Sequence, residues 1–448
     1  MLVVSASMGA GHDGAARELA ARLNEQGHHA SVRDFLDTAP LRLGTALRGG
    51  YEFELKHIPS AYDLTYRLWY RVPWLCGPVG WLIALLTRRR LLGWVADEGA
   101  DVVVSTYPLA TITLGRLRAS GRLDVPAVNF ITDFGVHPMW VHRGIDVDLA
   151  VHPSPAGAAA RRTGRPAVAC GPVVSAAFEP APDRAGQRRA ARRRFGLEPE
   201  DRAVMVVAGS WGVGGLMETF RAVATDGRFV PVVVCGRDDA LRATLTHHVA
   251  NTPGRAVIVG WTDQMAALMA ACDCLVENAG GLTSLEALRA GLPVISYQPI
   301  AGHGKENTAA MAAAGVSRMA AGVTQLLAAL DAVSAPGPAR DDQIATGRAM
   351  FVGDGSAHIV GAARSLPLGA PLPWRRPARV ATRIAVAGAV LLGLVWAGLT
   401  SGVEAAAEGA GVAYPAPGTG APTYVGVRLD EAQMATAGVP AVPLDSLR

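Results

Sequence analysis

The chain has 448 residues, half of them hydrophobic and 18% charged, with a formal net charge of +4. This length leaves room for two or three domains with sizeable cores, and the composition excludes a disordered chain. Arginine supplies almost all of the positive charge without forming one stripe interleaved with aromatic residues, so we predict no nucleic-acid partner. The five cysteines are scattered and include no C-x-x-C pair, which favours free thiols in a reducing compartment.

The chain opens on a β-loop-α-β unit of the doubly wound kind. An apolar strand at residues 2–6 is followed by a glycine-rich turn at 7–14, a helix and a second strand that ends at Asp34. The turn matches G-x-G-x-x-G, a dinucleotide fingerprint that is weak when it stands alone. His12 lies inside the turn at a helix N-terminus, a place suited to acid–base chemistry. An exposed residue of the helix start explains this histidine equally well.

Residues 51–90 are rich in aromatic and basic side chains. Their uncharged part, residues 72–87, is too short and too interrupted by proline to span a bilayer. Aromatic residues beside a basic cluster are typical of a segment that lies in the membrane interface and contacts anionic lipids. A buried helical hairpin with a solvated arginine cap is the alternative. The candidate interface residues are Trp69, Trp74, Trp81, Arg88, Arg89 and Arg90.

The rest of the first half predicts further parallel strands at residues 101–105 and 126–132. Asp133 follows the second of these strands, at the edge of an open sheet where ligands bind. Asp146 and Asp148 form a D-x-D pair that we interpret as a strand edge with little functional weight. We therefore expect a first domain at residues 1–178. Residues 179–202 read as a linker in which the arginines at 192–194 lie on a solvated helix.

A second Rossmann-like domain is predicted at residues 203–366. Its strands end in glycine or small polar residues, as a nucleotide crevice requires, for example at Gly209-Ser210 and Gly260-Trp261.

The most informative stretch is residues 274–307, a strand, a tight turn, a helix, a second strand and a polar loop. Gly280 and Gly281 precede the helix, whose unpaired N–H groups and dipole form an anion site, most often for phosphate. Thr283 and Glu286 have the spacing of a capping box, which is the simpler interpretation of Glu286 on spacing alone.

Near the end, residues 384–403 form a run of 20 residues without charge, long enough to cross a bilayer. Four arginines precede the run and two glutamates follow it, so the positive-inside rule places both domains in the cytoplasm. We predict a single-pass protein of the cytoplasmic membrane, with residues 404–448 as an extracytoplasmic tail of unknown fold. A buried alanine-rich helix is the alternative.

Taken together, these motifs resemble the diacylglycerol glycosyltransferases of the monogalactosyldiacylglycerol synthase family, which are related to the peptidoglycan GlcNAc transferase. The resemblance covers about residues 1–365 and implies an α/β protein of GT-B architecture, with two Rossmann-like domains facing a cleft. It is carried by the opening SASMGAGH, the region of Tyr51, Thr132-Asp133 with residues 137–140, Gly209-Ser210 with Gly214-Gly215, Gly260-Trp261, residues 277–286 and residues 299–307.

The resemblance also implies a role for each matching residue. The donor is a UDP-sugar, a co-substrate, and neither a cofactor nor a metal is expected. The donor side comprises Gly209 and Ser210, Gly260 and Trp261 at the uracil, Gly280, Gly281, Leu282 and Thr283 at the diphosphate, Glu286 at the ribose, and Glu306 and Asn307 at the sugar hydroxyls. Gly11 and His12 lie opposite, with His12 as the base and Asp133 as a second candidate near the acceptor. Many relatives carry Lys-Pro-Gly-Gly where this chain has Glu277-Asn278-Ala279-Gly280-Gly281.

The implied reaction is transfer of a hexose from a UDP-sugar to the 3-hydroxyl of diacylglycerol, with inversion. Another lipid acceptor, such as a polyprenyl-linked sugar, is the main alternative. A UDP-sugar epimerase, a dinucleotide oxidoreductase and a membrane-anchored nucleotide-sugar-binding module without activity are the others. The sequence does not choose between glucose, galactose and glucuronate.

Overall fold

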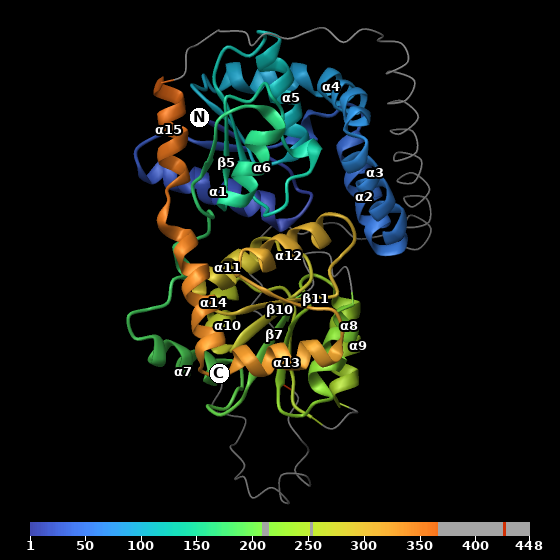
Figure 1. The fold of residues 1–448 in the computed structure, drawn as a ribbon, viewed down its shortest axis with the longest axis vertical. Helices are drawn as coiled ribbons and strands as arrows, with labels where there is room; N and C mark the ends of the chain where they lie inside the picture. The colour runs from blue at the N-terminus through green and yellow to red at the C-terminus, as the bar shows by residue number, and fades with distance from the viewer. Residues whose placement is uncertain (208–214, 251–253, 366–423, 427–448) are drawn as a thin grey trace, which may run out of the picture.

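The computed structural model describes residues 1–207, 215–250, 254–365 and 424–426, which form two domains, each around a parallel sheet (Figure 1). The first sheet has the order β2-β1-β3-β4-β5-β6 and is parallel throughout. The four inner strands are short, mainly apolar and buried, as expected for a sheet covered by helices on each side, whereas the edge strands β2 and β6 are partly exposed. They are β1 (Leu2–Ser5), β2 (Ser31–Asp34), β3 (Val103–Ser105), β4 (Ala127–Ile131), β5 (Val147–Ala150) and β6 (Ala167–Ala169).

The helices of the first domain follow the predicted doubly wound alternation. α1 (Ala10–Glu25) buries an alanine and leucine face against the sheet, and proline at the first turn starts α3, α5 and α6. The others that belong to this part of the chain are α2 (Leu43–His57), α3 (Pro59–Arg71), α4 (Cys76–Asp97), α5 (Pro108–Ala119) and α6 (Pro153–Thr163).

The second sheet has the order β12-β11-β10-β7-β8-β9-β13. Six of its strands are parallel: β7 (Ala203–Val207), β8 (Val230–Val234), β9 (Val257–Val259), β10 (Cys274–Glu277), β11 (Val294–Tyr297) and β12 (Arg318–Ala320). The helices around it are α8 (Leu216–Ala224), α9 (Asp239–Ala250), α10 (Met265–Ala271), α11 (Leu282–Ala290), α12 (His303–Ala313), α13 (Val323–Ser334) and α14 (Pro338–Ala349). The predicted α/β class with two Rossmann-like domains is therefore confirmed.

The last described helix, α15 (Gly355–Ser365), packs on the first domain (Figure 1). The sequence instead predicts that the second domain extends to residue 366. Gln26 Nε2, at the C-cap of α1, donates to Ser356 Oγ at 2.7 Å, and Ile359 is fully buried. The chain returns beside Cys170, where a Cβ at Gly353 would lie 2.2 Å from the Cys170 carbonyl oxygen. The two domains are therefore joined by two chain crossings.

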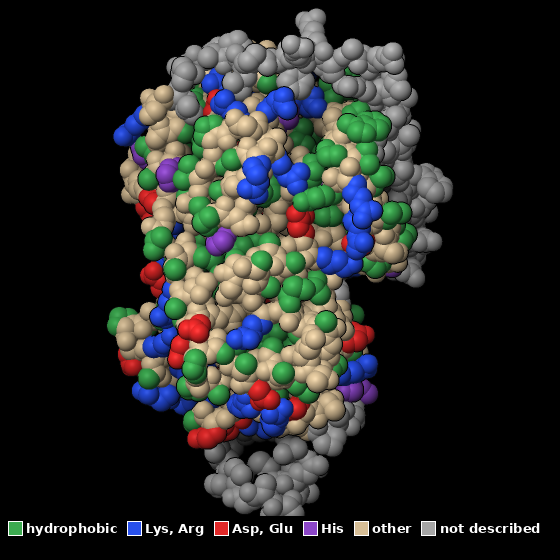
Figure 2. Space-filling model, viewed as in Figure 1, with side chains coloured by type: hydrophobic (Ala, Val, Ile, Leu, Met, Phe, Trp, Pro, Cys, Tyr) green, Lys and Arg blue, Asp and Glu red, His purple; other side chains and the backbone are tan. Residues whose placement is uncertain are grey.

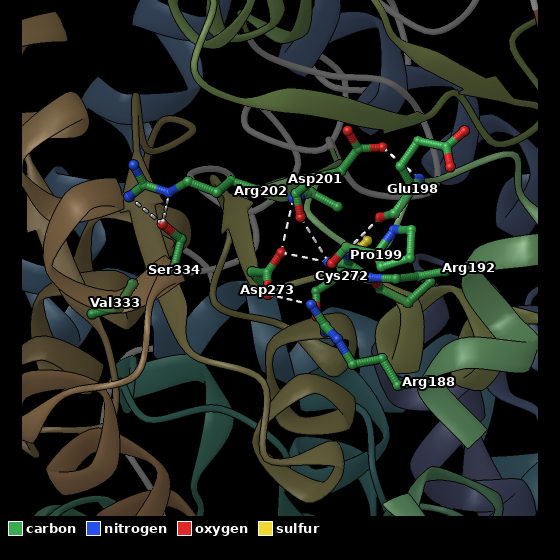
Figure 3. Close-up of polar contacts among 12 residues, drawn as sticks. Arg188, Arg192, Glu198, Pro199, Asp201, Arg202, Cys272, Asp273, Val333 and Ser334 are labelled. Carbon is green, nitrogen blue, oxygen red and sulfur yellow. Dashed lines mark hydrogen bonds and ion pairs between the residues drawn. The ribbon is translucent and has the colours of Figure 1, made fainter. Parts of the chain in front are cut away.

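The predicted linker is also more firmly held than expected. α7 (Arg184–Arg194) packs beside α10, and its Arg192 side chain is buried instead of solvated. Arg192 Nη2 pairs with Asp273 Oδ2 at 2.8 Å, and Arg188 Nη2 pairs with the other carboxylate oxygen at 2.5 Å (Figure 3). Asp273 also accepts a hydrogen bond from the Ala203 N–H. The segment is thus anchored to the second domain by a buried ion-pair cluster.

The segment predicted to lie in the membrane interface forms α2, α3, a short 3-10 turn at Pro73–Leu75 and α4, along one edge of the first domain (Figure 1). None of the α3 side chains is fully buried, and Leu64, Leu68 and Trp74 are 70%, 46% and 69% exposed. Basic and hydrophobic side chains lie next to one another over this edge (Figure 2). Arg89 and Arg90 are exposed, whereas Trp69, Trp81 and Arg88 are half-buried. The simple buried-hairpin alternative therefore does not fit α3.

Within the part of the chain that the structure describes, no helix is long and apolar enough to cross a bilayer. The predicted span at residues 384–403 lies outside that part. Of the predicted tail, residues Tyr424–Gly426 form β13, which pairs antiparallel with β9. A strand in this sheet lies on the same side of a membrane as the second domain, which differs from the extracytoplasmic position predicted for the tail.

Candidate active site

A cavity of about 390 Å³ lies between the two domains, within the size range of small-molecule sites. The start of α1 forms one side of it and the start of α11 the other (Figure 1). A Cβ at Gly14 would lie 2.4 Å from Leu282 Cδ2, so the two glycine turns are in direct contact. The third glycine of the G-x-G-x-x-G motif thus serves packing between the domains. Asp34 caps the turn after β2 through the Leu36 N–H.

His12 lines the cavity from the first turn of α1, because this helix begins at Ala10, earlier than the sequence predicts. Its Nδ1 lies 2.7 Å from the carbonyl oxygen of Thr106. A carbonyl oxygen only accepts hydrogen bonds, so Nδ1 carries the proton of the neutral ring and Nε2 is the basic nitrogen. Thr132 Oγ1 also lies 3.4 Å from Nδ1, and Tyr107 packs edge-on against the ring. These contacts hold the ring in one orientation. The hydrogen bond at Nδ1 thereby leaves Nε2 as the nitrogen that can accept a proton.

Asp133 lines the same cavity directly after β4. Burial raises the pKa of its carboxyl group, and the charge of Glu306 adds to this, while His12 and a hydrogen bond from Asn307 partly offset the rise. The hydrogen bond joins Asn307 Nδ2 and Asp133 Oδ1 at 3.1 Å. The two candidates for catalysis are thus brought to one cavity, as the sequence predicts.

The glycine turn after β10 brings backbone N–H groups to the opposite wall. Gly280 has a φ of 64°, and a Cβ there would lie 3.0 Å from Met311 Sδ, so only glycine fits this turn. The turn leads into α11, whose N-cap is Gly281 without a side-chain cap. The Ser284 N–H donates to the Gly281 carbonyl oxygen at 3.0 Å, so the N–H groups of Leu282 and Thr283 are those that helix geometry leaves for another acceptor. Leu282, Thr283 and Ser284 line the cavity at this point. An anion bound here would face the positive end of the helix dipole.

The carboxylate of Glu277, at the end of β10, is hydrogen-bonded to the backbone of this turn. Its Oε2 accepts from the N–H groups of Ala279 at 2.8 Å and Gly280 at 2.5 Å, and its Oε1 accepts from Ser296 Oγ at 2.6 Å. The carboxylate therefore supports the turn from within the domain and occupies the Gly280 N–H, which was predicted to bind diphosphate. This leaves the N–H groups that start α11 as the candidate anion site.

The structure removes the capping-box interpretation of Glu286. The N-cap of α11 is Gly281, with no side-chain cap, and Thr283 lies inside the helix. Burial raises the pKa of Glu286 to about 8. Glu286 is not among the residues that line the cavity, so its contact with a ribose stays a prediction.

Four other predicted donor residues, Gly260, Trp261, Glu306 and Asn307, lie apart from the cavity lining, whereas Gly11 is part of it. Asn307 is 1% exposed, and its Oδ1 accepts from the N–H groups of Phe134 and Gly135. Its Nδ2 also donates to the carbonyl oxygens of Ala279 and Gly280, so it joins the domains and has no group free for a sugar. Glu306 instead accepts a hydrogen bond from Tyr66 Oη at 2.5 Å.

Trp261 stands at the end of β9, 59% exposed and stacked under Arg237, beside the buried Gly260. Gly209 and Ser210 lie outside the described residues. Among the predicted membrane residues, only Trp69 lines the cavity. No cluster of three or more His, Cys, Asp or Glu in the described ranges is arranged to hold a metal.

Sequence patterns missed several residues that the structure brings to this site. His303 lines the cavity, and burial lowers its pKa to about 4, so it is neutral at ordinary pH. Tyr62 and Tyr66 line the cavity as well, next to it. Tyr62 and Tyr66 belong to the aromatic-rich segment at residues 51–90, and His303 belongs to residues 299–307. No local sequence pattern shows that these two segments meet.

Comparison with known proteins confirms the resemblance predicted from the motifs. Residues 12–161 match the family model of monogalactosyldiacylglycerol (MGDG) synthase. The processive diacylglycerol beta-glucosyltransferase of Bacillus subtilis (strain 168) is 27% identical over 237 residues, which are 49% of this chain and 57% of that protein. The protein of the same name from Bacillus thuringiensis (strain Al Hakam) is 25% identical over 335 residues, 68% of this chain and 78% of its own. The first of these alignments thus spans little more than half of the relative.

Solved structures share the fold. MurG from Acinetobacter baumannii superposes with a TM-score of 0.50 at 15% identity, covering 82% of this chain and 99% of MurG. Os79 from O. sativa, in complex with UDP, gives a TM-score of 0.52 at 14% identity, covering 81% of this chain and 98% of Os79. The GT-B-like arrangement of two Rossmann-like sheets is therefore shown.

Proposed function

We propose that this protein transfers a hexose from a UDP-sugar to the 3-hydroxyl of diacylglycerol, with inversion at the sugar C1. The observation that carries the proposal is the pairing of two features across one cavity. A histidine whose Nε2 is the basic nitrogen and the N-terminal end of α11 line the same cavity. A base and an anion site on opposite walls are what displacement of a nucleoside diphosphate by an alcohol requires.

In the proposed reaction, His12 Nε2 takes the proton of the acceptor hydroxyl while its oxygen forms a bond to the sugar C1. The bond between C1 and the diphosphate oxygen breaks, and UDP leaves with the bonding electrons. The N–H groups at the start of α11 stabilise the negative charge that develops on the diphosphate. Glu286 binds the ribose hydroxyls, and Asp133 assists near the acceptor.

The lipid acceptor is supported by the character of the first-domain wall. Apart from the catalytic candidates and a few polar tips, the cavity is lined there by apolar side chains of α2, α4 and the segment after β4, including Leu47, Leu55, Val79, Ile83 and Met139. The exposed hydrophobic residues of α3 lie outside the same wall. These apolar side chains would accommodate the acyl chains of a lipid acceptor whose hydroxyl reaches His12. This arrangement, like the names of the relatives, favours diacylglycerol over a water-soluble acceptor.

Product analysis tests the proposal directly. The full chain in detergent micelles is incubated with dioctanoylglycerol and, separately, UDP-glucose, UDP-galactose or UDP-glucuronate, and lipids are identified by mass spectrometry. One glycosylated diacylglycerol that depends on His12 is the expected result. Transfer only to an added polyprenyl-linked sugar would show that this lipid, and not diacylglycerol, is the acceptor. Interconversion of UDP-sugars without lipid would indicate an epimerase. UDP binding without any turnover would indicate that the protein is a nucleotide-sugar-binding module without activity.

A further inference from the structure

α3 contacts the second domain through a compact set of polar side chains on one helical face. Asp63 Oδ1 accepts a hydrogen bond from the Gly302 N–H at 2.9 Å, and Asp63 Oδ2 pairs with Lys305 Nζ at 3.3 Å. Tyr62 Oη is hydrogen-bonded to His303 Nδ1 at 3.1 Å, and Tyr66 Oη donates to Glu306 Oε2 at 2.5 Å. These contacts between Tyr62, Asp63 and Tyr66 and residues 302–306 are called the clasp below.

The clasp is closely packed as well as polar. Gly302 has a φ of 65°, and a Cβ there would lie 2.5 Å from Tyr62 Cε1 and 3.1 Å from Tyr66 Cγ. A side chain at Gly302 would therefore push α3 away. Asp63 is further fixed by Arg67 on its own helix, at 2.8 Å. Burial opposes ionisation of Asp63, but the Gly302 N–H and the Lys305 and Arg67 charges outweigh it and lower the pKa of the carboxyl group.

On the first-domain side α3 is held by aromatic contacts, because the His137 ring packs against Tyr66 and Tyr70 and the Arg162 guanidinium lies over the Tyr70 ring. None of its side chains is fully buried, and its outer face carries the exposed Leu64 and Leu68. Toward the cavity it contributes Tyr62, Thr65, Tyr66 and Trp69 to the apolar wall. α3 thus forms part of the cavity wall proposed for the acceptor and also contacts residues 302–306, where α12 begins. That segment lies beside the glycine turn, because the Ile300 N–H donates to the Asn278 carbonyl oxygen at 2.8 Å.

We propose that the clasp couples the two substrates: acceptor bound against α3 steadies residues 302–306, and thereby the glycine turn that binds UDP. Asp63 is a positioning residue in this scheme, since it touches neither the reacting atoms nor the cavity. By thermodynamic linkage, the acceptor then tightens UDP binding and UDP tightens acceptor binding by the same factor. The inference rests on the proposed function for its ligands and goes beyond it in naming the element that links them.

The test measures the UDP dissociation constant by calorimetry on the full chain in detergent micelles, with and without dioctanoylglycerol. In the unaltered protein the lipid is expected to tighten UDP binding by roughly fivefold or more. Asp63→Ala should reduce this ratio to about one, whereas Asp63→Asn should keep part of it, because its amide oxygen still accepts from the Gly302 N–H. Glu52→Ala is the matched control, since it removes the exposed partner of Lys56 on α2.

An unchanged ratio in Asp63→Ala, or no effect of the lipid on the unaltered protein, would overturn the coupling. Hydrogen exchange provides a readout that needs neither ligand. Asp63→Ala should speed exchange in α3 and residues 302–306 but not in α14, and equal exchange in both proteins would show that no clasp exists. Failure of the proposed function looks different, because the unaltered protein would then make no glycolipid. Equal melting temperatures of Asp63→Ala and Glu52→Ala would exclude a general loss of folding as the cause.

Discussion

On the first-domain side of the cavity the polar chemistry comes from the side chains of His12 and Asp133, set in an apolar wall. On the second-domain side it comes from backbone N–H groups at the start of α11, supported by the buried Glu277 carboxylate. The difference follows from the ligands expected on each side. A lipid hydroxyl needs a base and a dry surface, whereas a diphosphate is held well by fixed N–H dipoles. Substitutions should therefore act on turnover in the first wall and on UDP affinity in the second.

The largest effect is expected from His12→Ala. Loss of a general base typically costs about 10²–10⁴ in rate, and the second wall is untouched. We expect kcat to fall by about this factor while the UDP dissociation constant stays within about twofold, measured by lipid-product assays and calorimetry. His29→Ala, an exposed histidine of the same domain, is the control. Near-normal turnover of His12→Ala with intact UDP binding would remove His12 from the mechanism.

Next in size is Glu277→Ala in the second wall. Removing this carboxylate leaves the N–H groups of Ala279 and Gly280 without their acceptor, at about 1–3 kcal/mol for each buried group left unsatisfied. We expect a lower melting temperature and roughly tenfold weaker UDP binding, with acceptor affinity less affected.

Glu277→Gln is the matched variant, because its amide oxygen can accept from both N–H groups while its NH₂ group donates to Ser296 Oγ, reversing that hydrogen bond. It should behave close to the unaltered protein. Equal loss in both variants would mean that the charge matters and that the proposed support by hydrogen bonding is wrong.

A smaller effect is expected from Leu64→Ser with Leu68→Ser on the outer side of the first wall. Each buried leucine contributes about 1.5–3 kcal/mol, and only part of this is gained in a membrane interface. Vesicles containing phosphatidylglycerol should bind the double variant about tenfold more weakly, in a flotation assay. UDP affinity without lipid should be unchanged. Equal vesicle binding would exclude α3 from the membrane contact.

The smallest effect concerns Glu286, whose pKa burial raises from 4.5 to about 8. The folded protein holds this proton more tightly than the unfolded chain does, so stability falls as the pH rises from about 4.5 to about 8 and then stays constant. Glu286→Gln removes the titration. Its melting temperature relative to the unaltered protein should therefore rise by a few degrees between about pH 5 and about pH 8.5. A difference that does not change with pH would contradict the raised pKa, and unchanged UDP affinity would contradict the ribose contact.

Local patterns predicted much of the fold and part of the site. The strands β1, β4, β7 and β10 were visible as short apolar runs, and the two glycine turns followed from composition and position. His12 and Asp133 were identified because each follows a strand of an open sheet, where ligands gather. Glu277 and Arg192 were not, because a charged residue at a strand or helix end looks the same in sequence whether it faces solvent or a buried partner.

The sequence by itself determined the two Rossmann-like units and predicted an anion site at the start of α11, since both depend on residues a few positions apart. Only the tertiary structure decided which groups meet in the cavity. Asp63 and Gly302 are 239 positions apart in the chain, and α15 returns to the first domain after the whole second domain has been built. Such contacts arise from packing between distant segments, and periodicity and motif spacing carry no record of them.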